Sequence, residues 1–336
     1  MNPTLILGIE TSCDETAAAV VADGQRVLSN IINSQIAVHQ QFGGVVPEVA
    51  ARKHIENIVP VVVQAFKEAG ISYQDIDAVA VTNQPGLIGA LLVGVAFAKS
   101  LAYGLKKPLI AVNHLHGHIY ANFLEHNDIA FPALCLVVSG GHTSLVKMIT
   151  PGEFEIIGAT RDDAAGEAFD KIARFLGLDY PGGPAIEKAA LKGKRGSINL
   201  PRIWLDKDGF EFSFSGLKTA AINEWRKRAL KEEISVFDMA AEFQAAVVEV
   251  LVEKTIAAAG KHRVKTVLMA GGVAANSSLR SLMLKRANDI GVAVRYPSLK
   301  LCTDNAAMIA GKAYHDYLLK NYAPLSLNAY AGIKSL

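Results

Sequence analysis

The chain has 336 residues, of which 51% are hydrophobic and 20% are charged, and its formal net charge is +2. This composition is typical of an ordinary soluble globular protein that is long enough for two domains, and the charge neither requires nor excludes a nucleic-acid partner. The three cysteines are scattered and form no C-x-x-C pair, which argues against a disulfide framework and fits a reducing cytoplasm.

No targeting or membrane segment is recognisable in the sequence. Glu10 interrupts the apolar stretch at the N-terminus, and no basic region precedes that stretch, so we predict no signal peptide. The longest apolar run, residues 87–98, contains glycines and is too short to span a bilayer. We therefore predict that it forms a buried helix.

The first half of the chain begins with three predicted strands. Residues 5–32 give an apolar strand, a polar loop, a second strand, an Asp23-Gly24 turn and a third strand. A long helix is predicted at about residues 48–69. A buried strand from Asp77, a glycine-bearing loop and the helix at 87–98 follow it. Pro108 and the apolar run after it then indicate a short buried strand.

Three of the nine histidines lie between Asn113 and His118, directly after that strand. On a helix, His114 and His118 share one face, about 40° apart, whereas His116 points nearly the opposite way. Two imidazoles one turn apart make half of a metal site, although the same spacing also occurs on exposed helix ends. The position beyond the end of a strand, where open α/β sheets bind ligands, favours a metal site.

The second half repeats the plan of the first half. Residues 134–158 give a strand, a loop, a strand, a Pro151-Gly152 turn and a strand. A long helix is predicted at about 235–259, and Thr266 begins another buried strand that leads through a glycine loop into a helix. The second half carries an insertion at about 160–237.

The duplication predicts two similar α/β domains that face each other across a nucleotide cleft. We assign residues 1–112 and about 321–336 to an N-terminal domain, and residues 113–320 to a C-terminal domain. Extra segments on a duplicated scaffold often carry specificity. In the insertion, Asp170 and Glu187 are either surface acids or acceptors for the hydroxyl groups of a sugar.

Three loops occupy matched positions of the repeat, at residues 10–15, 139–143 and 271–276. Glycine loops bring backbone N–H groups close to phosphate, and helix N-termini add positive potential, so the loops predict nucleotide binding. The 139–143 loop is not a P-loop, because no Gly-Lys-Ser/Thr follows, and it is not a nucleophile elbow. A serine hydrolase is disfavoured, and the absence of H-E-x-x-H disfavours a thermolysin-like protease.

Two acidic positions outside the insertion have alternative interpretations. Asp14 lies in the first loop and is either part of a solvated turn or an acid that faces phosphates or serves as a base. Asp304 precedes an alanine-rich helix and is either its N-cap or a third metal ligand beside His114 and His118. Two histidines and one carboxylate with open positions suit Fe(II) or Zn(II).

Nine motifs in combination resemble the TsaD family of bacterial tRNA N6-adenosine threonylcarbamoyltransferases. They are GIETSCDET (8–16), FGGVVPEVAARKH (42–54), HLHGH (114–118), VSGGHT (138–143), DDAAGEAFDK (162–171), DYPGGP (179–184), FSFSGLK (212–218), MAGGVAAN (269–276) and CTDNAAMIA (302–310). The resemblance extends from about residue 5 to about residue 315. It implies the actin-like ATPase fold of sugar kinases and Hsp70, which agrees with the duplication.

The resemblance also implies an activity and its cofactors. A cytoplasmic enzyme of this family transfers the threonylcarbamoyl group from threonylcarbamoyl-AMP to N6 of adenosine 37 in tRNAs that read ANN codons. One Fe(2+) ion, or Zn(2+), would be held by His114, His118 and Asp304. Threonylcarbamoyl-AMP, or ATP or ADP, would bind in the cleft. The residues implied there are Val137, Val138, Ser139, Gly140, Gly141, Asp170, Gly183, Glu187 and Asn276.

The family further implies several partners and no membrane. These partners are tRNA, a TsaB-like paralogue that forms a heterodimer with the chain, a TsaE-like ATPase, and a TsaC-like synthase that supplies the adenylate. The sequence departs from the family at His116, where relatives often carry glutamate, and at Glu187, where aspartate is common.

The attacking N6 amine is a weak nucleophile, so a base is needed for its proton, and Asp14 is our candidate. Three other functions are compatible with parts of this pattern. A metal-dependent, glycoprotease-like peptidase would lack the general-base glutamate beside the histidines. A nucleotide-gated scaffold without catalytic activity, or a sugar kinase, would not need the histidine pair.

Overall fold

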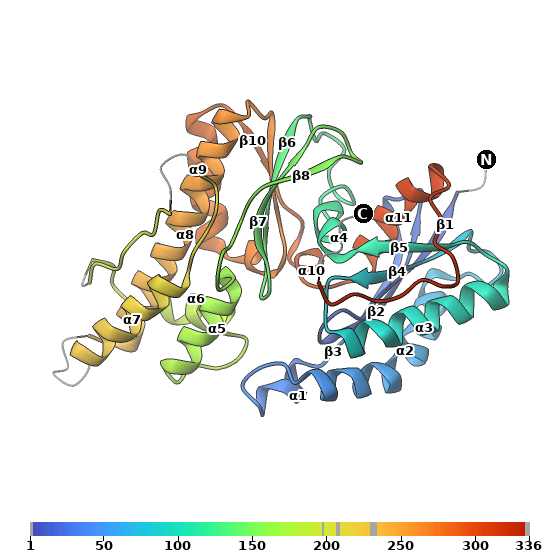
Figure 1. Cartoon of the computed structure of the whole chain (residues 1–336), viewed down its shortest axis with the longest axis horizontal. Helices are drawn as coiled ribbons and strands as arrows, with labels where there is room; N and C mark the ends of the chain where they lie inside the picture. The colour runs from blue at the N-terminus through green and yellow to red at the C-terminus, as the bar shows by residue number, and fades with distance from the viewer. Residues whose placement is uncertain (1–2, 197, 206–208, 229–233, 333–336) are drawn as a thin grey trace. The chain divides into compact units, whose positions relative to one another are not determined.

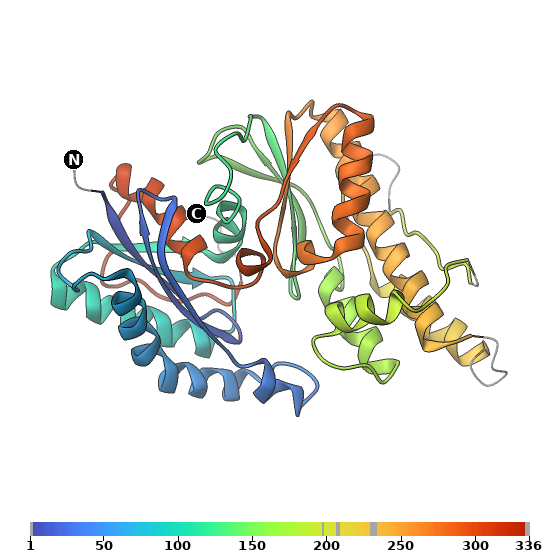
Figure 2. The same ribbon diagram turned by 180° about the vertical axis from the view of Figure 1, so that it is seen from behind.

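The computed structural model describes residues 3–196, 198–205, 209–228 and 234–332. The chain divides into two compact units, which are shown from opposite sides in Figures 1 and 2. Unit 1 comprises Met1–Asn127 and Pro297–Leu336, and unit 2 comprises Asp128–Tyr296. Each unit contains one five-stranded mixed sheet with helices packed against it.

Unit 1 is built around the order β3-β2-β1-β4-β5. Its elements are β1 (Leu5–Glu10), β2 (Glu15–Ala22), β3 (Arg26–Ser34), α1 (Ile36–Gln40), α2 (Pro47–Ala69), β4 (Ala78–Gln84), α3 (Ile88–Leu105), β5 (Leu109–Asn113), α4 (His114–Tyr120), α10 (Leu299–Cys302) and α11 (Ala307–Leu318). The predicted turn between the second and third strands is confirmed. Asp23 and Gly24 have φ angles of 51° and 71°, the left-handed values that a tight hairpin turn requires.

Unit 2 is built around the order β8-β7-β6-β9-β10. Its elements are β6 (Ala133–Val138), β7 (Thr143–Met148), β8 (Phe154–Ala159), α5 (Ala165–Phe175), α6 (Gly182–Ala190), α7 (Ser215–Arg228), α8 (Val236–Lys261), β9 (Thr266–Ala270), the 3-10 helix η2 (Gly272–Ala275), α9 (Ser277–Asp289) and β10 (Ala293–Arg295). Helices α5, α6 and α7 fall within the range 160–237, where we predict the insertion.

The two sheets follow the same plan, as the duplication in the sequence predicts. In unit 1, β1 pairs antiparallel with β2 and parallel with β4, and the outer pairs β2–β3 and β4–β5 are antiparallel and parallel. In unit 2, β6 takes the place of β1 and makes the same kinds of pairs with β7 and β9, and the outer pairs also correspond. The structure therefore confirms a duplicated α/β fold.

Both faces of the unit 1 sheet are covered by helices, as both views show (Figures 1 and 2). Successive side chains of a strand point to opposite faces, so Leu7 and Ile9 pack with α2 and α3, whereas Ile6 packs with α11. Gly8 lies under α11, where a Cβ atom would stand 2.3 Å from the Ala306 carbonyl oxygen. This contact fixes the start of α11, and with it the loop that contains Asp304.

The boundaries of the units differ from the domain boundaries that we predict from the sequence. The sequence places one boundary after residue 112 and the other near residue 320, whereas the compact units divide after Asn127 and before Pro297. The physical reason is packing, because α11 contacts β1, β2, β5 and α4. As a result, His114, His118 and Asp304 all belong to unit 1.

Helix α3 is longer than the helix that we predict at residues 87–98. Among the described residues it is the helix with the length and apolarity of a membrane span, and about a third of its 18-residue window is buried in the fold. Its inward side, which includes Leu91, Val95 and Ala98, packs in the core of unit 1 with β1 and α2. This packing is what we expect of the predicted core helix.

Candidate metal centre and phosphate loop

The histidine helix α4 starts where β5 ends because Asn113 caps it. The Asn113 side-chain oxygen accepts hydrogen bonds from the backbone N–H groups of Leu115 at 2.9 Å and His116 at 3.4 Å. This is the usual role of asparagine at an N-cap. The cap makes His114 the first helical residue, so that His114 and His118 lie one turn apart on the same face.

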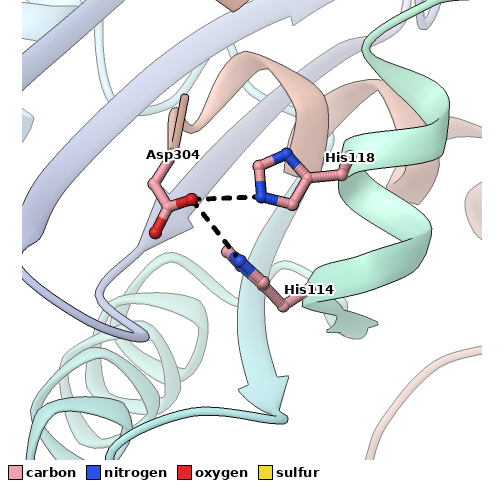
Figure 3. Close-up of side chains that lie close together, drawn as sticks. All are labelled: His114, His118 and Asp304. Atoms are coloured by element: carbon pink, nitrogen blue, oxygen red, sulfur yellow. Dashed lines mark hydrogen bonds and ion pairs between the residues drawn. The ribbon is translucent and has the colours of Figure 1, made fainter. Parts of the chain in front are cut away.

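Figure 3 shows that His114, His118 and Asp304 converge. The Nε2 atom of His118 lies 3.1 Å from Asp304 Oδ1, and the Nε2 atom of His114 lies 3.5 Å from the same oxygen. One donor atom from each residue lies within 4.8 Å of the other two. Both histidines are buried, with exposed fractions of 7% and 1%. The structure thus brings together the three residues that we predict as metal ligands, and their donor set suits Fe(II) or Zn(II).

Asp304 does not cap α11, which is the alternative that we consider from the sequence. The helix begins at Ala307, and the side-chain oxygen of Asn305 accepts the hydrogen bond of the Met308 N–H at 3.0 Å. The capping interpretation of Asp304 is therefore wrong, because the side chain that accepts a backbone hydrogen bond in the first turn of α11 is that of Asn305. The Asp304 carboxylate instead faces the two histidines.

Glu10 is a member of this centre that the sequence reasoning missed. It is fully buried at the end of β1, and its Oε2 atom lies 2.9 Å from His114 Nδ1. The same carboxylate accepts hydrogen bonds from the Thr82 hydroxyl at 2.6 Å and the Ser12 N–H at 2.5 Å. Burial by itself raises the pKa of Glu10, but the interactions with His114 lead the opposing effects, and the net pKa lies below its ordinary value.

The arrangement around His114 favours a positive charge between its ring and Asp304. A neutral His114 that donates its Nδ1 proton to Glu10 points its Nε2 lone pair at the Asp304 carboxylate, and either a second ring proton or a cation relieves this repulsion. Burial by itself opposes protonation of His114, but the carboxylates of Glu10 and Asp304 outweigh it and raise its pKa to about 9. A carboxylate behind a ligating histidine is a common outer partner in metal sites, so these residues fit a divalent cation.

Asp14 and Glu15 occupy the loop between β1 and β2, in the same unit as the metal centre. Asp14 is 8% exposed, and its side chain is hydrogen-bonded to that of Glu15. Burial, followed by the charges of Asp304 and Asp14, raises the pKa of Glu15 to about 10. Glu15 is therefore protonated near neutral pH and can donate its proton to the Asp14 carboxylate. Asp14 stays a candidate base, and Glu15 is its hydrogen-bonded acid neighbour.

The loop at residues 139–142 of unit 2 is the segment that we predict to bind phosphate. Its exposed members are Gly140 and Gly141, whereas Val137 and Val138 are buried at the end of β6. The N–H of Ser139 donates to the His142 carbonyl at 2.8 Å, so this N–H is engaged within the loop. The N–H groups of Gly140 and Gly141 are therefore the candidates for phosphate binding.

Helix α5 begins directly against this loop. A Cβ atom at Gly166 would lie 2.5 Å from the Ser139 carbonyl oxygen, and the Gly166 N–H donates to that oxygen at 3.2 Å. Only glycine permits so close an approach. The first turn of α5 therefore adds the positive potential of a helix N-terminus beside the loop.

The remaining predicted adenylate residues lie on α5, on α6 and directly after η2 of the same unit. Glu187 accepts hydrogen bonds from the N–H and hydroxyl groups of Ser277, at 2.8 and 2.5 Å. Asn276 caps α9 through its oxygen and donates to Gln244 Oε1 at 2.9 Å. Asp170 Oδ1 accepts the Gly182 N–H at 2.7 Å, and Gly183 follows at the start of α6. Glu187 thus lies beside Asn276, while Asp170 lies beside Gly183.

Two further expectations concern residues near these sites. His116 lies outside the group of three ligands, and its pKa falls to about 4 because it is buried and lies near the charge of Lys312. The aromatic residues of the FSFSGLK motif, Phe212 and Phe214, suit either core packing or a base-stacking platform, and because both are fully buried they belong to the core.

Comparison with known proteins identifies a family for this chain. A family profile described as TsaD, tRNA N6-adenosine threonylcarbamoyltransferase, matches residues 26–311. Proteins of that name from Syntrophomonas wolfei and Moorella thermoacetica are 69% and 59% identical to this chain. The alignments cover 100% and 97% of this chain, and 99% and 96% of the relatives.

Solved structures of low sequence identity show the fold. HypF from T. kodakarensis superposes with a TM-score of 0.64 at 15% identity, over 95% of this chain and 48% of HypF. Component A of the Acidaminococcus fermentans (R)-2-hydroxyglutaryl-CoA dehydratase has a TM-score of 0.56 at 15% identity, over 94% of this chain and 99% of that chain. Both have the actin-like ATPase fold. By its profile match and its close relatives, the chain belongs to the TsaD family of tRNA N6-adenosine threonylcarbamoyltransferases.

Proposed function

We propose that this chain transfers the threonylcarbamoyl group of threonylcarbamoyl-AMP to N6 of adenosine 37 in tRNAs that read ANN codons. The observation that carries the proposal is the convergence of His114, His118 and Asp304 in a member of this transferase family. A binding scaffold has no need of such a donor set. Nothing among the described residues favours the peptidase alternative.

In this proposal, His114 and His118 bind an Fe(2+) ion through their Nε2 atoms, and Asp304 binds it through a carboxylate oxygen. When bound, such a cation polarises the carbamoyl carbonyl as a Lewis acid. Glu10 holds the Nδ1 proton of His114, which leaves the Nε2 lone pair for the metal. Zn(2+) fits the same donors, so metal analysis of the purified protein decides between the two ions.

The residues of unit 2 bind the AMP part of the adenylate. The N–H groups of Gly140 and Gly141, with the N-terminus of α5, stabilise the phosphate as negative charge develops on the leaving AMP. Asp170 and Glu187 accept hydrogen bonds from ribose hydroxyls, and Gly183 and Asn276 complete the nucleoside site. Asp14 takes the proton from N6 as the amine attacks the carbonyl carbon and AMP leaves.

The cellular setting belongs to the same proposal. The enzyme works in the cytoplasm on tRNA, with a TsaC-like synthase to supply the adenylate and a TsaE-like ATPase in the complex. A TsaB-like paralogue forms a heterodimer with it. Three free cysteines, two of them buried, fit a reducing compartment.

An exposed apolar stripe on unit 1 supports the heterodimer. Its members lie one turn apart on two helices that contact each other, α2 and α3. They are Ile55, Val59 and Val63 on α2, and Ile88 and Leu92 on α3, each between 45% and 65% exposed. A paralogue of the same fold carries an equivalent helix pair, so apolar faces of like shape pack together. Val59→Glu with Leu92→Glu is expected to abolish the heterodimer in size-exclusion chromatography, while Leu319→Glu, at another exposed position, leaves it intact.

The test of the function is reconstitution. The purified chain is incubated with its partners, threonine, bicarbonate, ATP and tRNA, and the digested tRNA is analysed for the modified nucleoside. We expect threonylcarbamoyladenosine with the complete mixture and none with tRNA that carries guanosine at position 37. Peptide cleavage by the chain alone, without any modified nucleoside, would support the peptidase instead.

A further inference from the structure

The loop that carries Asp14 is held by three consecutive backbone carbonyls. Strand pairing does not reach the loop, so each carbonyl needs another donor. The carbonyl of Ser12 accepts the N–H of Leu87 at 2.8 Å, and that of Asp14 accepts the N–H of Gln35 at 2.9 Å. The carbonyl of Cys13 accepts a side-chain donor, the Nε2–H of His54 on α2, at 2.9 Å.

His54 makes a second hydrogen bond on the other side of the acidic pair. Its Nδ1 atom lies 2.8 Å from the Thr16 hydroxyl. Because a carbonyl only accepts, Nε2 carries the proton, and Nδ1 of the neutral ring then accepts the Thr16 O–H. The ring therefore joins the residue before Asp14–Glu15 to the residue after them.

The surroundings of the ring allow little adjustment. His54 and Thr16 are fully buried, and burial is the main reason that the pKa of His54 lies below its ordinary value, which keeps the ring neutral. On its other side the loop is packed against Gly86, where a Cβ atom would lie 2.6 Å from the Ser12 carbonyl oxygen. The His54 position is thus determined by both of its hydrogen bonds and by close packing.

We propose that His54 is a positioning residue for the transfer reaction, which clamps Cys13 and Thr16 and so fixes the Asp14 and Glu15 carboxyl groups. The proposal rests on the proposed function, since it assigns Asp14 the part of base. His54 acts through the loop and touches neither the metal ligands nor the predicted adenylate residues in the described contacts. It also gives a purpose to the 42–54 motif, of which it is the last residue.

Two substitutions at this position separate the clamp from simple packing. His54→Leu fills much of the space but donates and accepts no hydrogen bond. His54→Gln keeps an N–H at the place of Nε2 and an acceptor oxygen near the place of Nδ1, so it can restore both hydrogen bonds. Ile58→Ala is the matched control, because Ile58 is buried one turn further along α2 and packs in the hydrophobic core of unit 1.

Each variant is compared with the wild type in the complete complex. We expect His54→Leu to lower kcat about 10- to 100-fold, because small misplacements of reacting groups slow a reaction by such factors. The KM values for threonylcarbamoyl-AMP and for tRNA are expected to stay within about threefold of the wild type, and the amount of bound metal is expected to stay unchanged. His54→Gln is expected to recover kcat to within about threefold of the wild type. Ile58→Ala is expected to lower the melting temperature without lowering kcat.

Amide hydrogen exchange of residues 11–16 gives a readout that does not depend on turnover. We expect exchange about tenfold faster in His54→Leu, and wild-type exchange in His54→Gln and Ile58→Ala. If His54→Leu does not fold, Thr16→Val removes the hydroxyl partner and is expected to speed the same exchange and lower kcat.

Three results would overturn the proposal: wild-type kcat in His54→Leu, equal losses in His54→Leu and His54→Gln, or the same loss in Ile58→Ala. If Thr16→Val is used because His54→Leu does not fold, wild-type amide exchange of residues 11–16 and wild-type kcat in Thr16→Val would also overturn it. A wild-type complex that forms no modified nucleoside would refute the proposed function instead, and exchange alone would then decide whether the clamp exists.

Discussion

Replacing Glu10 by glutamine tests whether the buried carboxylate prepares His114 for metal binding. The glutamine oxygen is expected to stay at the Ser12 N–H, which lies 2.5 Å from Oε1, since the amide NH2 group would clash there. The NH2 group then faces His114 Nδ1 from the position of Oε2, which lies 2.9 Å from Nδ1 in the wild type. Nδ1 must become an acceptor, so the ring proton moves to Nε2.

A proton on Nε2 occupies the lone pair that would bind the metal. Loss of such an outer partner typically lowers metal affinity about 10- to 100-fold, which is about 1.4 to 2.8 kcal/mol. Glu10 is fully buried, so water cannot replace it, and we expect the upper half of that range. Thr82→Val is the matched control, because it removes a hydrogen bond to Glu10 and keeps the carboxylate.

The assay is titration of the metal-free protein with Zn(2+), and anaerobically with Fe(2+), against a chelator of known affinity. We expect the Kd of Glu10→Gln to rise about 30- to 100-fold, and that of Thr82→Val to rise less than about fivefold. A Kd within about twofold of the wild type in Glu10→Gln would refute the reasoning, because it would mean that His114 presents its lone pair without the carboxylate.

Three further predictions follow from the same contacts. His118→Ala should lower bound metal and nucleoside formation together, while His116→Gln keeps both, as measured by elemental analysis and nucleoside chromatography. Asp14→Asn should bind the adenylate as the wild type does in calorimetry but transfer about 100-fold more slowly, and unchanged transfer would remove Asp14 as the base. Gly8→Ala should destabilise the fold by about 1 to 3 kcal/mol in thermal unfolding because its Cβ atom would clash with the Ala306 carbonyl, whereas Gly104→Ala, with open space around it, should not.

Local patterns in the sequence predict much of this structure. Alternating apolar residues and turn signals place the strands of both halves, because strand and hairpin signals depend on residues that are close in sequence. The spacing of His114 and His118 predicts a shared helical face, and α4 has it. The unit boundary could not be predicted in this way, because α11 joins unit 1 through contacts with strands about 200 to 300 residues earlier in the sequence.

The place of Glu10 in the metal centre follows from the strand order of the unit 1 sheet. Strands β1, β4 and β5 are parallel neighbours in that order, so their carboxyl ends lie at one edge of the sheet. Glu10 ends β1, Thr82 lies near the end of β4, and His114 directly follows β5. The rule that places His114 at a ligand-binding edge therefore also places Glu10 there. The sequence does not show that β1 and β4 are neighbours, so it does not show that Glu10 and His114 lie at the same edge.

His54 is a harder case, because its local pattern points to an ordinary core residue. It is spaced four residues from Ala50 and from Ile58, and all three are buried on the inner side of α2. A histidine on an apolar helix face is predicted to be a satisfied core residue, and His54 is one: both ring nitrogens have partners. Its importance depends on which loop those partners belong to, and periodicity along α2 has no information about that. Only the tertiary structure distinguishes a histidine that fills the core from one that holds the loop with Asp14.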